Sequence, residues 1–94
     1  MEIQLGQLND GKYRLEMIVM PRGEHHLEVI EPGDCVALVV ISGEVTAQYQ
    51  GPVRAPARTL KARRGAPVFL VSPGTYSVIA DKNTLGFRGS RTNG

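Results

Sequence analysis

The chain has 94 residues and a formal net charge of +2, which allows one domain with one hydrophobic core. Leu, Ile, Val and Phe supply 25 of these residues, above the roughly 20% below which chains tend to stay disordered. A single cysteine excludes an internal disulfide and a cysteine zinc cluster. There is no basic leader with an apolar run, and no run reaches the ~18 apolar residues of a membrane span. We therefore expect a cytoplasmic protein with no membrane partner.

Two early segments alternate apolar and polar residues with the period of a β-strand. Residues 13–19 predict a half-buried strand in which Arg14 and Glu16 lie opposite an apolar face made of Tyr13, Leu15, Met17 and Val19. Residues 24–30 predict a second strand, in which one face carries His25, Leu27 and Val29 and the other carries His26, Glu28 and Ile30. The segment 31–34 has Pro and Gly at its second and third places, which predicts a type II turn.

The middle of the chain predicts a hairpin. Residues 35–41 are apolar on both faces and rich in β-branched side chains, as in a central strand covered on both sides, with Cys35 a small buried hydrophobe. Ser42 and Gly43 make a tight reversal, and residues 44–50 return with Val45, Ala47 and Tyr49 pointing inward. Residues 51–57 contain two prolines and a glycine, so they predict an irregular loop.

The second half continues with short predicted strands at residues 58–62, 67–71, 75–80 and 84–88. Turns containing Gly, Pro or Asn separate them. About nine short antiparallel strands at this spacing indicate an all-β fold, a sandwich or a barrel. We therefore expect one β domain over residues 1–88 and a flexible tail over residues 89–94.

The two halves of the chain carry opposite charge. Residues 1–50 hold three basic and eight acidic residues, a net charge of −5, while residues 51–94 hold eight basic and one acidic, a net charge of +7. Because the halves interleave in a small β fold, we expect cross-strand pairs of opposite charge. The alternatives are a positive surface around residues 54–64 that attracts an anion, or a head-to-tail contact between copies.

This order of strands and turns resembles the cupin superfamily of small jelly-roll barrels. The phrase Val39-Val40-Ile41-Ser42-Gly43-Glu44 stands where the hairpin of the first cupin motif is expected, and residues 65–76 stand where the second is expected. Together with residues 13–20 they are most similar to the C-terminal cupin-like domain of type I mannose-6-phosphate isomerases, over residues 12–88. The resemblance implies a jelly roll and no activity, because the isomerases hold their metal and catalytic groups in another domain.

The chain departs from the pattern of metal-binding cupins, in which two histidines separated by one residue join a glutamate and a later histidine. His25 and His26 are adjacent, so in a strand they point to opposite faces. Tyr76 stands where the last histidine is expected, and His26 and Glu28 supply two ligands only. We therefore predict no metal site and no cofactor. Neither a Gly-x-Ser-x-Gly elbow nor a glycine-rich phosphate loop occurs, so no catalytic residue is assigned.

Three functional hypotheses remain. The first is a non-catalytic protein that binds, and thereby sequesters, a small anionic metabolite such as a sugar phosphate or nucleotide, because arginine forks recognise such anions. Its expected contacts are Arg54, Arg58, Arg88, His25 and Tyr76. The second is a protein-interaction module or inhibitor that docks through charged faces. The third is a cupin-type enzyme acting on a carbohydrate or nucleoside, with His26 and Glu28 in the barrel.

Two further expectations concern partners. Nucleic acid ranks below the small ligands, since the five basic residues between positions 54 and 64 have no aromatic neighbours on which bases could stack. A β-sandwich of this size leaves strand edges and one broad sheet face uncovered, so we expect a homodimer that buries them.

Overall fold

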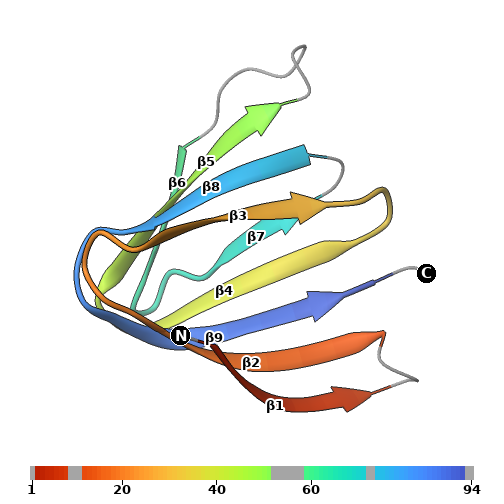
Figure 1. Ribbon diagram of the computed structural model, residues 1–94, viewed down its shortest axis with the longest axis horizontal. Coiled ribbons are helices and arrows are strands. Elements are labelled where there is room, and N and C mark those ends of the chain that lie inside the picture. Colours follow the sequence, from red (N-terminus) through yellow and green to blue (C-terminus); the bar gives the residue numbers. More distant parts are fainter. Residues whose placement is uncertain (1, 9–11, 52–58, 72–73, 93–94) are drawn as a thin grey trace.

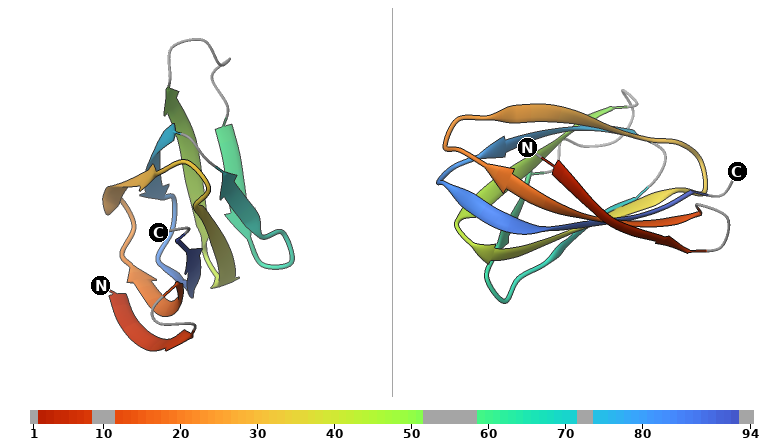
Figure 2. Two further views of the ribbon diagram at one scale, coloured as in Figure 1. Left: turned by 90° about the vertical axis from the view of Figure 1, so that its right-hand side faces the viewer. Right: turned by 60° about the horizontal axis from the view of Figure 1, so that its bottom comes forward.

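The computed structural model describes residues 2–8, 12–51, 59–71 and 74–92, and within these ranges the chain forms nine strands and no helix. The strands pair into a five-stranded sheet of order β1-β2-β9-β4-β7 and a four-stranded sheet of order β3-β8-β5-β6, with every neighbour antiparallel. Figures 1 and 2 show the sheets as two layers of a jelly roll, which confirms the all-β prediction. The strands are β1 (Glu2–Leu8), β2 (Tyr13–Met20), β3 (His25–Ile30), β4 (Cys35–Ser42), β5 (Glu44–Gly51), β6 (Thr59–Arg63), β7 (Val68–Val71), β8 (Gly74–Ala80) and β9 (Thr84–Arg91).

Turn chemistry places the strand ends as the sequence predicts. The Asp34 N–H donates a hydrogen bond to the Glu31 carbonyl over 2.9 Å, and Gly33 has a φ of +86°, as a type II turn requires. Gly43 joins β4 to β5 with a φ of +96°, and a Cβ there would meet the main chain around Thr84. Both turns are therefore confirmed, and glycine is needed at each on backbone grounds.

The core fills the space between the two sheets. From β2 onward, alternate residues of the strands point inward, including Val45, Ala47 and the half-buried Tyr49 of β5, as predicted. The largest fully buried side chains come from both sheets and are Ile18, Met20, Leu38, Leu70, Val45 and Val78.

The burial of β2 is the reverse of what its apolar face predicts. The buried residues are Glu16, Ile18 and Met20, while Tyr13 and Leu15 of the apolar face are exposed. The register pairs Glu16 with Arg88 of β9, and both side chains point inward, where their charges meet. Glu16 can therefore be buried because Arg88 partners its charge, although hydrophobicity alone predicts that the apolar face of β2 is the buried one.

Burial of β4 also differs from expectation, because the strand is covered on one side only. Val36, Leu38 and Val40 are buried, whereas Val39 and Ile41 are exposed and Cys35 is half-buried. The strand is central within its sheet, between β9 and β7, but no second layer lies over its outer face in the single chain.

The N-terminal part of the domain contains one more strand than predicted, and the last strand extends further than predicted. Strand β1, which the sequence analysis does not identify, pairs with β2 at the edge of the sheet. Strand β9 continues through Gly89 to Arg91 because β2 and β4 pair with it on both sides, so the expected tail begins too early. Residues 52–57 of the expected loop lie outside the described residues, and so do residues 93–94 of the expected tail.

Candidate functional site

A cluster of charged side chains lies between the sheets, where jelly rolls otherwise hold apolar residues. Arg88 of β9 donates from Nε to Glu28 Oε1 over 2.9 Å and from Nη2 to Glu28 Oε2 over 2.6 Å. This two-pronged pair joins β9 of the five-stranded sheet to β3 of the four-stranded sheet. The arginine comes from the basic half of the chain and the glutamate from the acidic half. The predicted cross-strand pairing of opposite charges is seen between Arg88 and Glu16, which lie opposite each other on β9 and β2.

His26 binds the same carboxylate. Residues 26 and 28 share the inner face of β3, and His26 Nε2 lies 3.0 Å from Glu28 Oε1. An ionised carboxylate only accepts hydrogen bonds, so His26 carries a proton on Nε2. Burial raises the pKa of the Glu28 carboxyl, but hydrogen bonds from His26 and Arg88 and the charges of both lower the pKa by more. The net pKa lies below its ordinary value of 4.5, and Glu28 is ionised at neutral pH.

Glu16 supplies a second buried carboxylate that is less well satisfied. Its Oε1 lies 3.7 Å from Arg88 Nη1 and 3.8 Å from Arg14 Nη1. Its Oε2 is buried without a hydrogen-bond partner among the described residues. A buried acceptor left unpaired costs about 1–3 kcal/mol or more, so Glu16 is held in place at a cost to stability.

A pocket of about 190 Å³ lies at the end of the jelly roll where Arg88 approaches the surface. It is close to the β3–β4 turn and to the end of β9, at the right of Figure 1. Three arginines and one acid supply its charges, and its lining residues are Arg14, Val29, Ile30, Asp34, Cys35, Val36, Arg88, Ser90, Arg91 and Thr92. Sites for drug-sized molecules have about 300–1,000 Å³, so this pocket suits a ligand that is smaller than a drug-sized molecule.

The structure brings only part of the predicted binding set to this pocket. Arg88 lines it, His25 lies on the outer face of β3, and Tyr76 is buried in the core with its ring 5.1 Å from that of Tyr49. Arg54 and Arg58 lie outside the described residues.

Three residues of the site, namely Arg14, Glu16 and Arg91, are not predicted as site residues from the sequence. The first two form the polar face of β2, and their inward direction follows only from pairing with β9. Arg91 falls in the segment expected to be a tail. Arg88 and Ser90 are polar residues at the two-residue spacing of a strand, and this is the signal that could have extended the strand past residue 88.

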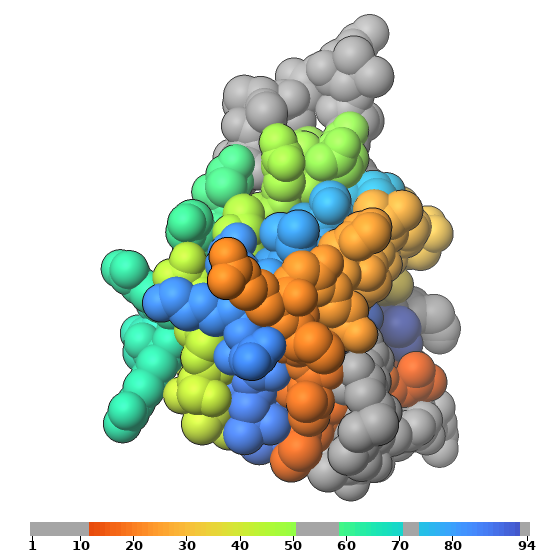
Figure 3. Space-filling view, turned by 60° about the vertical axis from the view of Figure 1, so that its left-hand side comes forward, coloured from red at the N-terminus to blue at the C-terminus, as the bar shows by residue number. Residues whose placement is uncertain are grey.

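The described residues contain no group of three or more His, Cys, Asp or Glu side chains placed to hold a metal ion. His26 and Glu28 come together, as the sequence predicts, but their contact is with each other. A second, apolar hollow of about 500 Å³ lies at the opposite end, between the β2–β3 and β8–β9 turns. Figure 3 views this end, where the orange and blue segments that border the hollow lie side by side.

Comparison with known proteins identifies the fold. Solved structures similar to this chain include a cupin superfamily protein from Desulfitobacterium hafniense, with a TM-score of 0.76 at 8% identity over 99% of this chain and 77% of that one. The cupin domain of Schizosaccharomyces pombe Cnp3 gives a TM-score of 0.74 at 9% identity, over 98% and 60%. The cupin domain of an XRE-family transcriptional regulator from Enterobacter cloacae gives 0.67 at 17%, over 96% and 90%.

The chain therefore has the cupin fold, as the sequence resemblance predicts. No model of a protein family matches it, and no curated protein does so. The narrower resemblance to mannose-6-phosphate isomerases stays a prediction. A search for helices long and apolar enough to cross a membrane finds none in the part of the chain that the structure describes.

Proposed function

We propose that this protein binds a small anionic metabolite, such as a sugar phosphate, in the arginine-lined pocket and acts by holding the molecule rather than by converting it. The observation that carries the proposal is the convergence of Arg14, Arg88 and Arg91 on one pocket of about 190 Å³. Guanidinium groups recognise phosphate and carboxylate through paired hydrogen bonds. The cytoplasmic location expected from the sequence belongs to the same proposal.

The three arginines have different parts in this binding. Arg88 is held by Glu28 through Nε and Nη2, so it contributes charge at the base of the pocket. Arg14 is half-exposed and its contact with Glu16 is long, at 3.8 Å, and Arg91 is exposed at the end of β9. By alternation Arg14 lies on the inner face of its sheet and Arg91 on the outer face. We therefore assign the anionic group to the end of the sheet, where both arginines line the same pocket.

The rest of the ligand is expected to carry hydroxyl groups. Ser90 and Thr92 line the pocket, and their hydroxyls can donate and accept hydrogen bonds. A sugar hydroxyl can donate to Asp34, which also lines the pocket, whereas a second anionic group would be repelled by this carboxylate. These charges favour a ligand with one anionic group and several hydroxyls.

The enzyme hypothesis has less support from the geometry. His26 and Glu28 are the acid–base candidates, yet they bind each other, and Arg88 binds the same carboxylate. A carboxylate with a lowered pKa is a poor base near neutral pH. Glu28 is better explained as a structural residue that connects β3 to β9 through its hydrogen bonds with Arg88.

Thermal unfolding with and without ligand tests the proposal. The melting temperature should rise with inorganic phosphate and rise further with glucose 6-phosphate, since a ligand that binds only the folded state stabilises it by RT ln(1 + [L]/Kd). The double variant Arg14→Gln/Arg91→Gln should lose both shifts, whereas Arg64→Gln, which changes an exposed arginine outside the pocket, should keep them.

Two results would contradict the proposal. One is a wild-type protein that neither anion stabilises at millimolar concentration. The other is a phosphate shift that survives in Arg14→Gln/Arg91→Gln. Catalysis is tested on the same samples. We expect that neither the wild type nor His26→Ala converts the sugar phosphate. Conversion that disappears in this variant would favour the enzyme hypothesis.

A further inference from the structure

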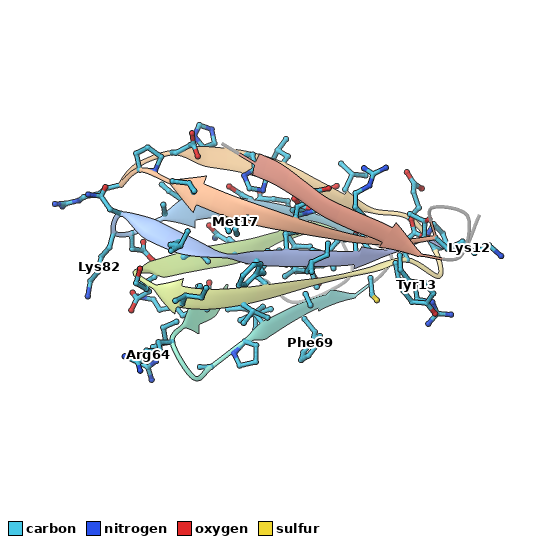
Figure 4. The ribbon with its side chains drawn as sticks, turned by 90° about the horizontal axis from the view of Figure 1, so that it is seen from below. Lys12, Tyr13, Met17, Arg64, Phe69 and Lys82 are labelled. Atoms are coloured by element: carbon cyan, nitrogen blue, oxygen red, sulfur yellow. The ribbon has the colours of Figure 1, made fainter. Side chains whose placement is uncertain are left out.

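The outer face of the five-stranded sheet is apolar across four strands. The register places Met17, Phe87 and Val39 in one row, and Leu15, Gly89, Ala37 and Phe69 in the next. Figure 4 labels Tyr13 and Met17 on β2 and Phe69 near the other edge of this sheet. Two further rows flank these. One contains Val19 and Leu85, and the other contains Tyr13, Arg91 and Cys35. Among the described residues of the four rows, the only charged residue is Arg91, at the end of the face.

The outer face of the four-stranded sheet provides an internal comparison. Its exposed apolar residues are confined to β3 and one position of β8, namely Leu27, Val29 and Ile79. The outward positions of β5 and β6 are polar or charged, and include Thr46, Gln48, Thr59, Lys61 and Arg63. One sheet thus has the polar outer side of a solvated antiparallel sheet, and the other has the composition of a covered one.

The exposed area matches what a stable interface needs. Tyr13, Leu15, Val39, Ile41 and Phe69 are between 41% and 65% exposed. If a residue of this size offers about 150–250 Å² when fully open, these five side chains expose on the order of 500 Å². The half-buried neighbours Met17, Val19, Leu85 and Phe87 raise the total to roughly 700 Å², close to the ~800 Å² that each partner contributes to a standard interface.

We propose that this face is the contact surface of a homodimer, in which the five-stranded sheets of two copies pack face to face. A partner must be apolar and nearly free of charge over the whole area, and a second copy offers the same face by symmetry. The surface also has complementary relief. Gly89 and Ala37 form a low strip between Leu15 and Phe69, and a Cβ at Gly89 would meet no atom within 4 Å. The large side chains of one copy can occupy the low strip of the other.

Sedimentation equilibrium tests the proposal. The wild-type protein should sediment at twice the chain mass of 10.2 kDa, with a Kd of about 1 µM or lower, as interfaces of this size give. The variant Leu15→Lys/Phe69→Lys should sediment as a folded monomer, with its Kd raised at least about 100-fold by the burial of unpaired charge. The matched control Leu27→Lys/Val29→Lys introduces the same charges at residues that are each 63% exposed on the other sheet, and it should stay dimeric.

A second variant tests the shape of the surface rather than its polarity. Gly89→Leu keeps the face apolar and meets no atom of its own chain at the Cβ, but it fills the low strip. We expect it to weaken the dimer at least about tenfold while the monomer keeps its circular dichroism spectrum. A tighter dimer, a monomeric wild type, a dimer that persists in Leu15→Lys/Phe69→Lys, or equal disruption by the control would each overturn the inference. Phosphate stabilisation of the monomeric variant is a separate result, so the interface and the anion pocket can fail independently.

Discussion

Replacing Arg88 with methionine removes one charge and leaves two buried carboxylates without their shared partner. The side chains of Glu28 and Glu16 are 6% and 8% exposed, and Arg88 is the cation nearest to both. Breaking a buried ion pair by removing one partner costs about 3–5 kcal/mol. A domain of this size has a free energy of unfolding of about 5–15 kcal/mol, so we expect Arg88→Met to remove a large part of the stability at pH 7.

The pH dependence separates this electrostatic cost from a loss of packing. In the wild type the folded-state pKa of Glu28 is lowered, so its stabilisation is fully present above about pH 4.5 and is lost as the pH falls through that pKa. In Arg88→Met the burial of Glu28 acts without the arginine, and the folded variant can take up a proton instead of holding an unpaired charge. The difference in unfolding free energy between the two proteins should therefore shrink from pH 7 to pH 4.

Urea unfolding at pH 7 and pH 4, followed by circular dichroism, measures this difference. With a slope of about 1–1.5 kcal/mol per M urea, a loss of about 4 kcal/mol lowers the midpoint by roughly 3 M. If Arg88→Met does not fold, Arg88→Lys keeps the charge without the two-pronged geometry and should show a smaller loss of the same kind. A loss below about 1 kcal/mol at pH 7, or a loss that is equal at both pH values, would refute the reasoning.

Two further variants test the packing. Leu38→Ala should lower the unfolding free energy by about 2–5 kcal/mol, because Leu38 is fully buried. Leu27→Ala changes an exposed residue, so it should alter the unfolding free energy by less than about 0.5 kcal/mol. Thermal unfolding measures both, and similar values for the two variants would mean that the core is wrongly placed. Gly86→Ala should cost about 1–3 kcal/mol because its Cβ would overlap the Val39 carbonyl oxygen. An alanine usually strengthens a strand relative to glycine, so unchanged or higher stability would show that β9 and β4 lie further apart there.

Much of the fold follows from local signals in the sequence. The β4–β5 hairpin is predicted because residues 35–41 are β-branched and apolar and Gly43 permits the reversal. The turn at residues 31–34 is predicted because Pro and Gly have fixed backbone preferences. Such signals act within a few residues, so they can be identified without the tertiary structure.

The candidate site follows only in part. The alternation of β3 places His26 and Glu28 on one face, and the structure confirms that they meet. Alternation cannot say which face is buried when both contain a plausible core or site. The apolar face of β2 was expected to lie inside, but Glu16 is buried, because Arg88 on the neighbouring strand pairs with it.

The sequence by itself thus determined most of the strands, the main turns and the cupin resemblance, because these depend on period, backbone preference and order along the chain. Only the tertiary structure decided that Arg88 lies between Glu28 and Glu16, and that Arg14 and Arg91 reach the same pocket. It also decided that the apolar face of β2 joins those of β9 and β4 on the outside. Each of these results depends on which strands become neighbours, and pairing between residues up to 78 positions apart is set by the packing of the whole jelly roll.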